Sequence, residues 1–155
     1  MERLKDTYFL TDLDADEFRT LESLTTIRFV KKEETIICQG QPADELFIVR
    51  TGSVKVLLSV PEGMDAIDAA DQTLVVLGPR ECFGEFAFVD RQPSSATVQA
   101  AEDSTLFVLR HADLDRTLLA DPVSACKIYK ALVGVLVSRF RHTDVELALR
   151  KAVGY

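Results

Sequence analysis

The hydrophobic positions of this chain follow two different spacings. Between residues 26 and 110, short apolar runs rich in Val, Ile and Phe alternate with turn residues, a pattern typical of β-strands. The runs predicted as strands are 27–30, 35–38, 45–50, 53–58, 73–77, 96–100 and 104–109. On either side, apolar residues recur every three or four positions, which predicts a helix over 15–24, a short amphipathic turn over 113–119 and a long helix over 122–150.

Capping and turn residues mark the ends of these elements. Asp14, followed three residues later by Glu17, is close to a capping box, and Asp121-Pro122 combines a capping acid with a proline at the first helical position. Thr51-Gly52 and Glu102-Asp103 are predicted to close two pairs of adjacent strands, 45–50 with 53–58 and 96–100 with 104–109. Residues 61–72 contain four acidic residues, a proline and a glycine, which predicts a long acidic loop.

These elements predict one α+β domain over residues 1–155. An antiparallel β-sandwich or barrel over about 26–110 is followed by helices over about 112–151. The long helix carries two apolar stripes, the first of Ile128, Leu132, Val135 and Leu136, the second of Val133, Val137 and Phe140. A helix that packs against a single hydrophobic core needs only one apolar stripe. We expect the second to meet an identical subunit; the alternative is that the whole helix docks on its own barrel.

The charge and hydropathy of the chain argue against a nucleic-acid-binding protein and against a membrane-spanning protein. The net charge is −7, and no basic cluster is present that could neutralise nucleic-acid phosphates, so we expect no DNA binding. The N-terminus lacks the apolar core of a signal peptide, and the longest apolar run, 131–137, is far short of the roughly 20 residues that span a membrane. The chain is therefore predicted to be a cytoplasmic domain without membrane contact.

Catalytic and metal-binding patterns are absent from the sequence. It contains two histidines, His111 and His142, and three widely spaced cysteines that we expect to be buried free thiols. There is no Gly-x-Ser-x-Gly, His-Glu-x-x-His or Walker motif. The sequence therefore predicts neither an enzyme, nor a metal site, nor a bound cofactor.

Residues 83–98 read F-G-E-F-A-F-V-D-R-Q-P-S-S-A-T-V, in which a Gly-acid pair opens an apolar turn and a Pro-Ser-Ser-Ala-Thr-Val segment then enters a strand. Together with Gln39-Gly40, residues 43–49, Gly52, residues 54–56 and Leu77-Gly78, this segment resembles the cyclic nucleotide-binding domain. That family includes bacterial catabolite activators, kinase regulatory subunits and nucleotide-gated channels. The resemblance covers about residues 9–148 and implies an eight-stranded, jelly-roll-like β-roll with helices at both ends. Transcription factors of the family continue into a helix-turn-helix domain, which we do not expect here because the sequence stops soon after the long helix.

The resemblance also implies a site. In the family, the Gly-acid turn starts a short helix whose N–H groups face the cyclic phosphate, in keeping with the affinity of helix N-termini for anions. Glu85 would accept a hydrogen bond from the ribose 2′-hydroxyl, and Ser95 and Ala96 would lie beside the phosphate. The candidate ligand-binding residues are Phe83, Gly84, Glu85, Phe86, Ala87, Arg91, Pro93, Ser94, Ser95, Ala96 and Thr97.

One residue departs from the family pattern. Nucleotide-binding members usually carry Arg after the proline, where this chain has Ser94, and a serine hydroxyl cannot pair bidentately with a phosphate. Arg91 is either a replacement cation or a surface residue. Arg139, Arg141, His142 and Thr143 lie where family members cover the base, although we expect them to face solvent.

Two functions follow from this pattern. The first is a regulatory module that senses cyclic AMP, cyclic GMP or another small anion, with altered affinity, and signals through its C-terminal helix. The alternative is a degenerate domain that no longer binds a nucleotide and acts as a dimeric scaffold for a protein partner.

Overall fold

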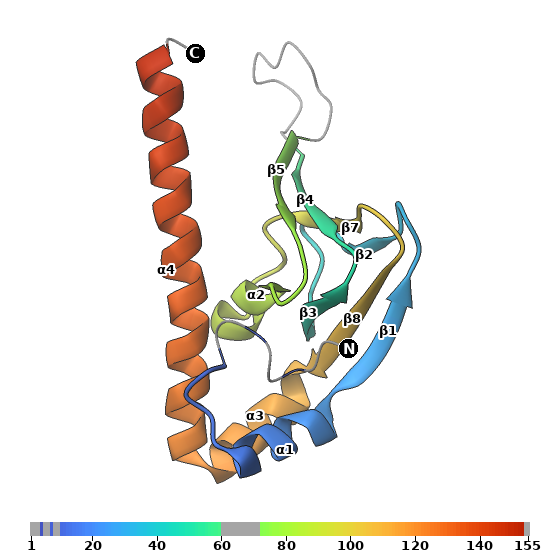
Figure 1. Ribbon diagram of the computed structural model, residues 1–155, viewed down its shortest axis with the longest axis vertical. Coiled ribbons are helices and arrows are strands. Elements are labelled where there is room, and N and C mark those ends of the chain that lie inside the picture. Colours follow the sequence, from blue (N-terminus) through green and yellow to red (C-terminus); the bar gives the residue numbers. More distant parts are fainter. Residues whose placement is uncertain (1–3, 5–6, 8–9, 60–71, 154–155) are drawn as a thin grey trace.

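The computed structural model describes residues 4, 7, 10–59 and 72–153, and it describes the side chains of these residues except that of Gln72 and those after residue 142. Figure 1 shows a roll of strands flanked by helices, with one long helix running along its side. The elements are α1 (Ala15–Leu24), β1 (Thr26–Val30), β2 (Thr35–Ile37), β3 (Glu45–Thr51), β4 (Val54–Leu58), β5 (Gln72–Leu77), β6 (Cys82–Phe83), α2 (Glu85–Asp90), β7 (Thr97–Ala100), β8 (Ser104–Arg110), α3 (His111–Ala120) and α4 (Pro122–Val153).

The strands form two antiparallel four-stranded sheets, in the orders β1-β8-β3-β6 and β2-β7-β4-β5. One core lies between the sheets and includes Phe47, Val54 and Leu106. A second core joins the first sheet to the helices through residues such as Ile48, Leu114 and Leu132. The α+β class and the β-roll predicted from the sequence are confirmed.

Both predicted strand pairs are wrong. β3 pairs with β6 and β8, whereas β4 pairs with β5 and β7, so the chain changes sheet at Thr51-Gly52. Gly52 has φ +82°, and a Cβ atom there would lie 2.2 Å from the Ser104 hydroxyl. The same change of sheet occurs between β7 and β8. Turn residues show that the chain reverses, but they do not show in which sheet it continues.

The sequence prediction also missed β6, whose two residues are too few to show a period. Phe83 of β6 stacks on Phe47 of β3 with ring centroids 4.9 Å apart. The predicted acidic loop at 61–72 lies outside the described residues, apart from Gln72, which begins β5.

The helix boundaries follow the predicted caps. Asp14 and Glu17 form the complete capping box of α1, and Asp121 accepts hydrogen bonds from the N–H groups of Val123 and Ser124 at the start of α4. On α4, Ile128, Leu132 and Val135 of the first predicted stripe pack into the second core, while Val133, Val137 and Phe140 are exposed by 52%, 44% and 68%. Within the described part of the chain, no helix has the length and apolar character needed to cross a membrane.

Candidate functional site

The predicted phosphate cradle begins at Gly84, between β6 and α2. This residue has φ +83°, and a Cβ atom there would lie 2.5 Å from the carbonyl oxygen of Glu45. Only glycine fits both the backbone angle and the close approach. Gly84 thereby places Glu85 at the first position of α2, with Phe83 and Ala87 buried on either side and Phe86 half-exposed.

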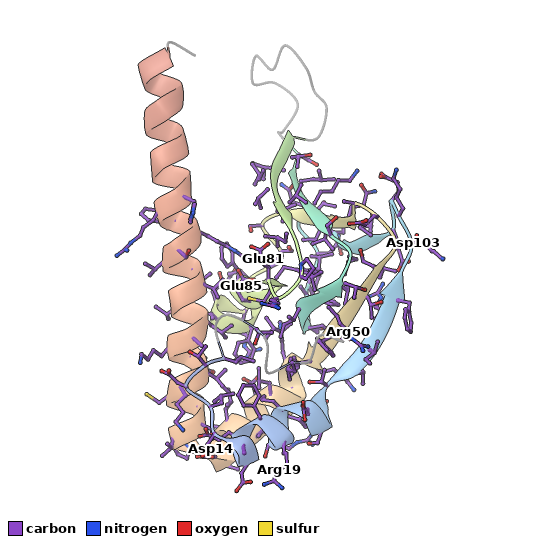
Figure 2. All side chains as sticks on the ribbon, in the orientation of Figure 1. Asp14, Arg19, Arg50, Glu81, Glu85 and Asp103 are labelled. Atoms are coloured by element: carbon purple, nitrogen blue, oxygen red, sulfur yellow. The ribbon has the colours of Figure 1, made fainter. Side chains whose placement is uncertain are left out.

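Glu85 is 2% exposed and lies in the region between α4 and the roll (Figure 2). Its Oε1 atom accepts a hydrogen bond from Nη1 of Arg139 in α4, and Nη2 of the same arginine donates to the carbonyl of Cys82. Burial raises the pKa of the Glu85 carboxyl above its ordinary value, and the Arg139 guanidinium opposes that rise. The ion pair thus joins the cradle to the long C-terminal helix.

The expectation that Arg139 faces solvent is therefore wrong. Its side chain is 31% exposed and pairs with Glu85. The signal was present in the sequence, because Ile128, Leu132, Val135 and Arg139 follow one another at helical spacing on one stripe. Arg141 and His142 are exposed, as expected, and the side chain of Thr143 lies outside the described residues.

Ser94, the residue in place of the usual arginine, bonds within its own segment. Its hydroxyl donates to the carbonyl of Ala96 at 2.8 Å. Its backbone bonds to Gln41 at 2.9 Å and to Gly40 at 2.8 Å, which ties the segment to the turn after β2. Pro93 and Ser95 are exposed. The Ser94 hydroxyl proton is thus already used within the loop.

Thr97 ends the predicted segment at the start of β7. Its Oγ1 atom accepts a hydrogen bond from the backbone N–H of Gln39 at 3.1 Å. This bond and the Ser94–Gly40 bond hold the 93–97 segment against the same turn. The structure therefore brings two parts of the family pattern, Gln39-Gly40 and residues 93–97, into contact.

Arg91 is directed toward α3. It caps the C-terminus of α2 with φ 58°, and its guanidinium bonds to both carboxylate oxygens of Asp115 at 2.7 and 2.6 Å. It also lies over the ring of Phe88, 5.1 Å from the centroid. The structure commits this cation to α3, and its role as a replacement for the missing arginine stays a prediction.

A cavity of about 370 Å³ lies between the turn after β5 and the middle of α4. Its wall includes Arg80, Cys82, Gly134 and Arg139, but none of the eleven residues predicted from the sequence. Its volume falls within the range of small-molecule sites. Arg139 lines this cavity and also pairs with Glu85. Its side chain therefore connects the cavity to the predicted phosphate cradle.

No group of three or more His, Cys, Asp or Glu side chains is placed to hold a metal ion within the described ranges. The three cysteines are free, but only Cys82 is buried, so the expectation of buried thiols is wrong for Cys38 and Cys126.

Comparison with known proteins identifies the family. Residues 27–121 match the cyclic nucleotide-binding domain family. The chain is 30% identical over 115 residues to the CRP-like cAMP-activated global transcriptional regulator of Mycobacterium tuberculosis, covering 74% of this chain and 46% of that protein. It is 31% identical over 136 residues to the cAMP-dependent protein kinase regulatory subunit of Aspergillus fumigatus, covering 84% and 32%. The chain therefore spans less than half the length of each of these relatives.

A solved structure shares the fold. A cyclic nucleotide-binding domain from Methylobacillus flagellatus superposes with a TM-score of 0.81 at 25% identity, covering 90% of this chain and 75% of that one. Together with the match over residues 27–121, this shows that the chain belongs to the cyclic nucleotide-binding domain family.

Proposed function

We propose that this chain is a regulatory module that binds a cyclic nucleotide at residues 83–97 and signals through α4. The observation that carries the proposal is the ion pair between the buried carboxylate of Glu85, in the first turn of α2, and the partly exposed Arg139 of α4. A ribose hydroxyl that donates to Glu85 would share the carboxylate with Arg139. Ligand binding would then change the contact that anchors α4.

The proposed affinity is lower than in members that carry the usual arginine. A charge-assisted hydrogen bond contributes roughly 1.5–3 kcal/mol and a neutral one about 0.5–1.5 kcal/mol. In this chain the Ser94 hydroxyl already donates to Ala96, and Arg91 is paired with Asp115. A cradle with Ser94 should therefore bind a cyclic nucleotide about tenfold or more weakly than a cradle with arginine at the same position.

The proposed assembly is a homodimer through α4. Val133, Val137 and Phe140 form an exposed apolar stripe, and a second copy of the helix would cover it. In this account the domain is a non-enzymatic cytoplasmic regulator, and the chain itself does not contact DNA or membranes.

The second candidate function is a scaffold that has lost nucleotide binding and recruits a protein partner. The self-bonded Ser94 hydroxyl and the exposed stripe on α4 favour it. Isothermal titration calorimetry with millimolar cyclic AMP and cyclic GMP distinguishes the two functions. Saturable binding that is lost in Glu85→Ala supports the sensor, whereas no heat in folded wild-type protein favours the scaffold.

A further inference from the structure

A second cavity, of about 210 Å³, lies where the loop before β3, the end of α2 and the start of α3 meet. Its apolar wall comes from Pro42, Ala43, Ala87 and Pro93, and its polar wall includes Asp44 and His111. It shares no lining residue with the larger cavity beside α4. This cavity is therefore distinct from the one beside α4, although Ala87, Arg91 and Pro93 on its wall also belong to the candidate nucleotide-binding residues.

His111 forms the buried part of this cavity wall. The residue is 4% exposed, and its Nε2 atom has no hydrogen-bond partner within the described part of the chain. The ring is held by a hydrogen bond with the backbone of Glu45 and by Phe88, whose ring centroid lies 5.2 Å away. Burial is the main cause that lowers the pKa of His111, which keeps the imidazole neutral at pH 7. A neutral imidazole that donates through one nitrogen presents a lone pair on the other.

Asp44 supplies a second acceptor. The residue is exposed, and within the described ranges its carboxylate makes neither an ion pair nor a hydrogen bond. The one guanidinium on the cavity wall, that of Arg91, is paired with Asp115. The region thus holds two carboxylates against one cation. The unused groups of His111 and Asp44 are acceptors, while the exposed amide of Gln92 on the same wall can donate or accept. Such a wall favours a ligand that carries a positive charge and N–H donors.

We propose that this cavity binds a small primary ammonium compound. Its N–H groups would donate to Nε2 of His111 and to the carboxylate of Asp44. Its short alkyl body would lie against Pro42, Ala43, Ala87 and Pro93. An unpartnered acceptor in a buried setting is costly, so a donor in the cavity satisfies a group that the fold leaves unpaired. The proposal does not rest on nucleotide binding.

The chain is well suited to a test by NMR, because it contains only two histidines. Protein labelled with ¹⁵N-histidine is titrated with n-propylammonium chloride at pH 7.5 and constant ionic strength. The imidazole nitrogens of His111 and of the exposed His142 are followed together. We expect a saturable shift of Nε2 in His111 and none in His142. The neutral 1-propanol, and tetramethylammonium, which has no N–H group, should each bind at least about tenfold more weakly.

Asp44→Asn keeps the shape of the side chain and removes its charge. It should weaken propylammonium binding roughly tenfold. Asp103→Asn is the matched control, because it makes the same change at the opposite end of β8 from His111. It should leave the affinity unchanged. A backbone amide spectrum of each variant confirms that it is folded.

Three results would overturn the proposal. These are no saturable shift at His111 up to 100 mM propylammonium, equal binding of 1-propanol, or equal loss of affinity in Asp44→Asn and Asp103→Asn. Any of them would mean that the cavity is an ordinary hydrated pocket rather than an ammonium site.

Discussion

Arg139 of α4 binds the carboxylate of Glu85, a residue 54 positions earlier in the chain, in the first turn of α2. The same guanidinium bonds to the carbonyl of Cys82 in β6. One side chain of the C-terminal helix therefore contacts both sides of Gly84, the residue that forms the predicted cradle. Because of this contact, a change at Glu85 alters an ion pair of α4, and a movement of α4 alters the hydrogen bond that Glu85 accepts.

Removing the arginine should destabilise the fold. Arg139→Met would leave Glu85 buried without a counter-ion, and we expect a loss of about 2 kcal/mol in the free energy of unfolding. Because a neutral amide tolerates burial better than a carboxylate, adding Glu85→Gln should recover part of that loss. Urea denaturation of the two single variants and the double variant measures the coupling. Additive effects in this cycle would show that the pair does not interact.

The buried carboxylate should also give the protein a distinctive dependence on pH. Burial raises the pKa of Glu85 above 4.5, so the folded state holds this proton more tightly than the unfolded state. The raised pKa of Glu85 stabilises the folded protein below pH 4.5, and this stabilisation is lost as the pH rises through the pKa that Glu85 has in the folded state. Wild type should therefore lose stability relative to Glu85→Gln between pH 4 and pH 7 in urea denaturation. A difference that moves in the opposite direction would mean that Arg139 outweighs burial.

The three cysteine thiols should differ in reactivity according to their burial. Burial is the main cause that raises the pKa of Cys82 to about 12, whereas Cys38 and Cys126 are exposed. Because the thiolate is the reactive form, a colorimetric thiol reagent at pH 8 should label two cysteines in the native protein and three after denaturation. Rapid labelling of three thiols in folded protein would place Cys82 in contact with solvent.

The exposed stripe on α4 should control assembly. Phe140 is 68% exposed, so Phe140→Glu should leave the fold intact and convert the proposed dimer to a monomer in light scattering after size-exclusion chromatography. Arg141→Glu introduces an acid at the next position and is the matched control. A wild-type monomer at 100 μM, or a Phe140→Glu dimer, would contradict the proposed interface.

Local sequence features predicted the elements well. The capping box at Asp14 and the caps at Asp121-Pro122 fixed the starts of α1 and α4, because these signals depend on neighbouring residues. Strand pairing was not predicted, because Thr51-Gly52 reverses the chain in the same way whether the next strand joins the same sheet or the opposite one. The two-residue strand β6 was too short for any periodic signal.

At the candidate site, too, local features were predicted from the sequence, whereas contacts between distant residues were not. Gly84 and Glu85 were identified by resemblance, and their local geometry agrees with a glycine-specific turn before a short helix. The contact of Glu85 with Arg139 joins residues far apart in sequence, and only the helical spacing from Leu132 and Val135 pointed to it. The pairing of Arg91 with Asp115 had no sequence signal, since a loop arginine can turn toward many acids.

We propose that residues 83–97 form a nucleotide cradle weakened by Ser94. Calorimetric titration of cyclic AMP into wild type and into Ser94→Arg examines this cradle. We predict that Ser94→Arg binds at least about tenfold more tightly than wild type, because a guanidinium replaces a neutral hydroxyl beside the phosphate. If folded Ser94→Arg binds no more tightly than wild type, Ser94 does not weaken the cradle, and if neither folded protein binds, residues 83–97 are not a nucleotide site.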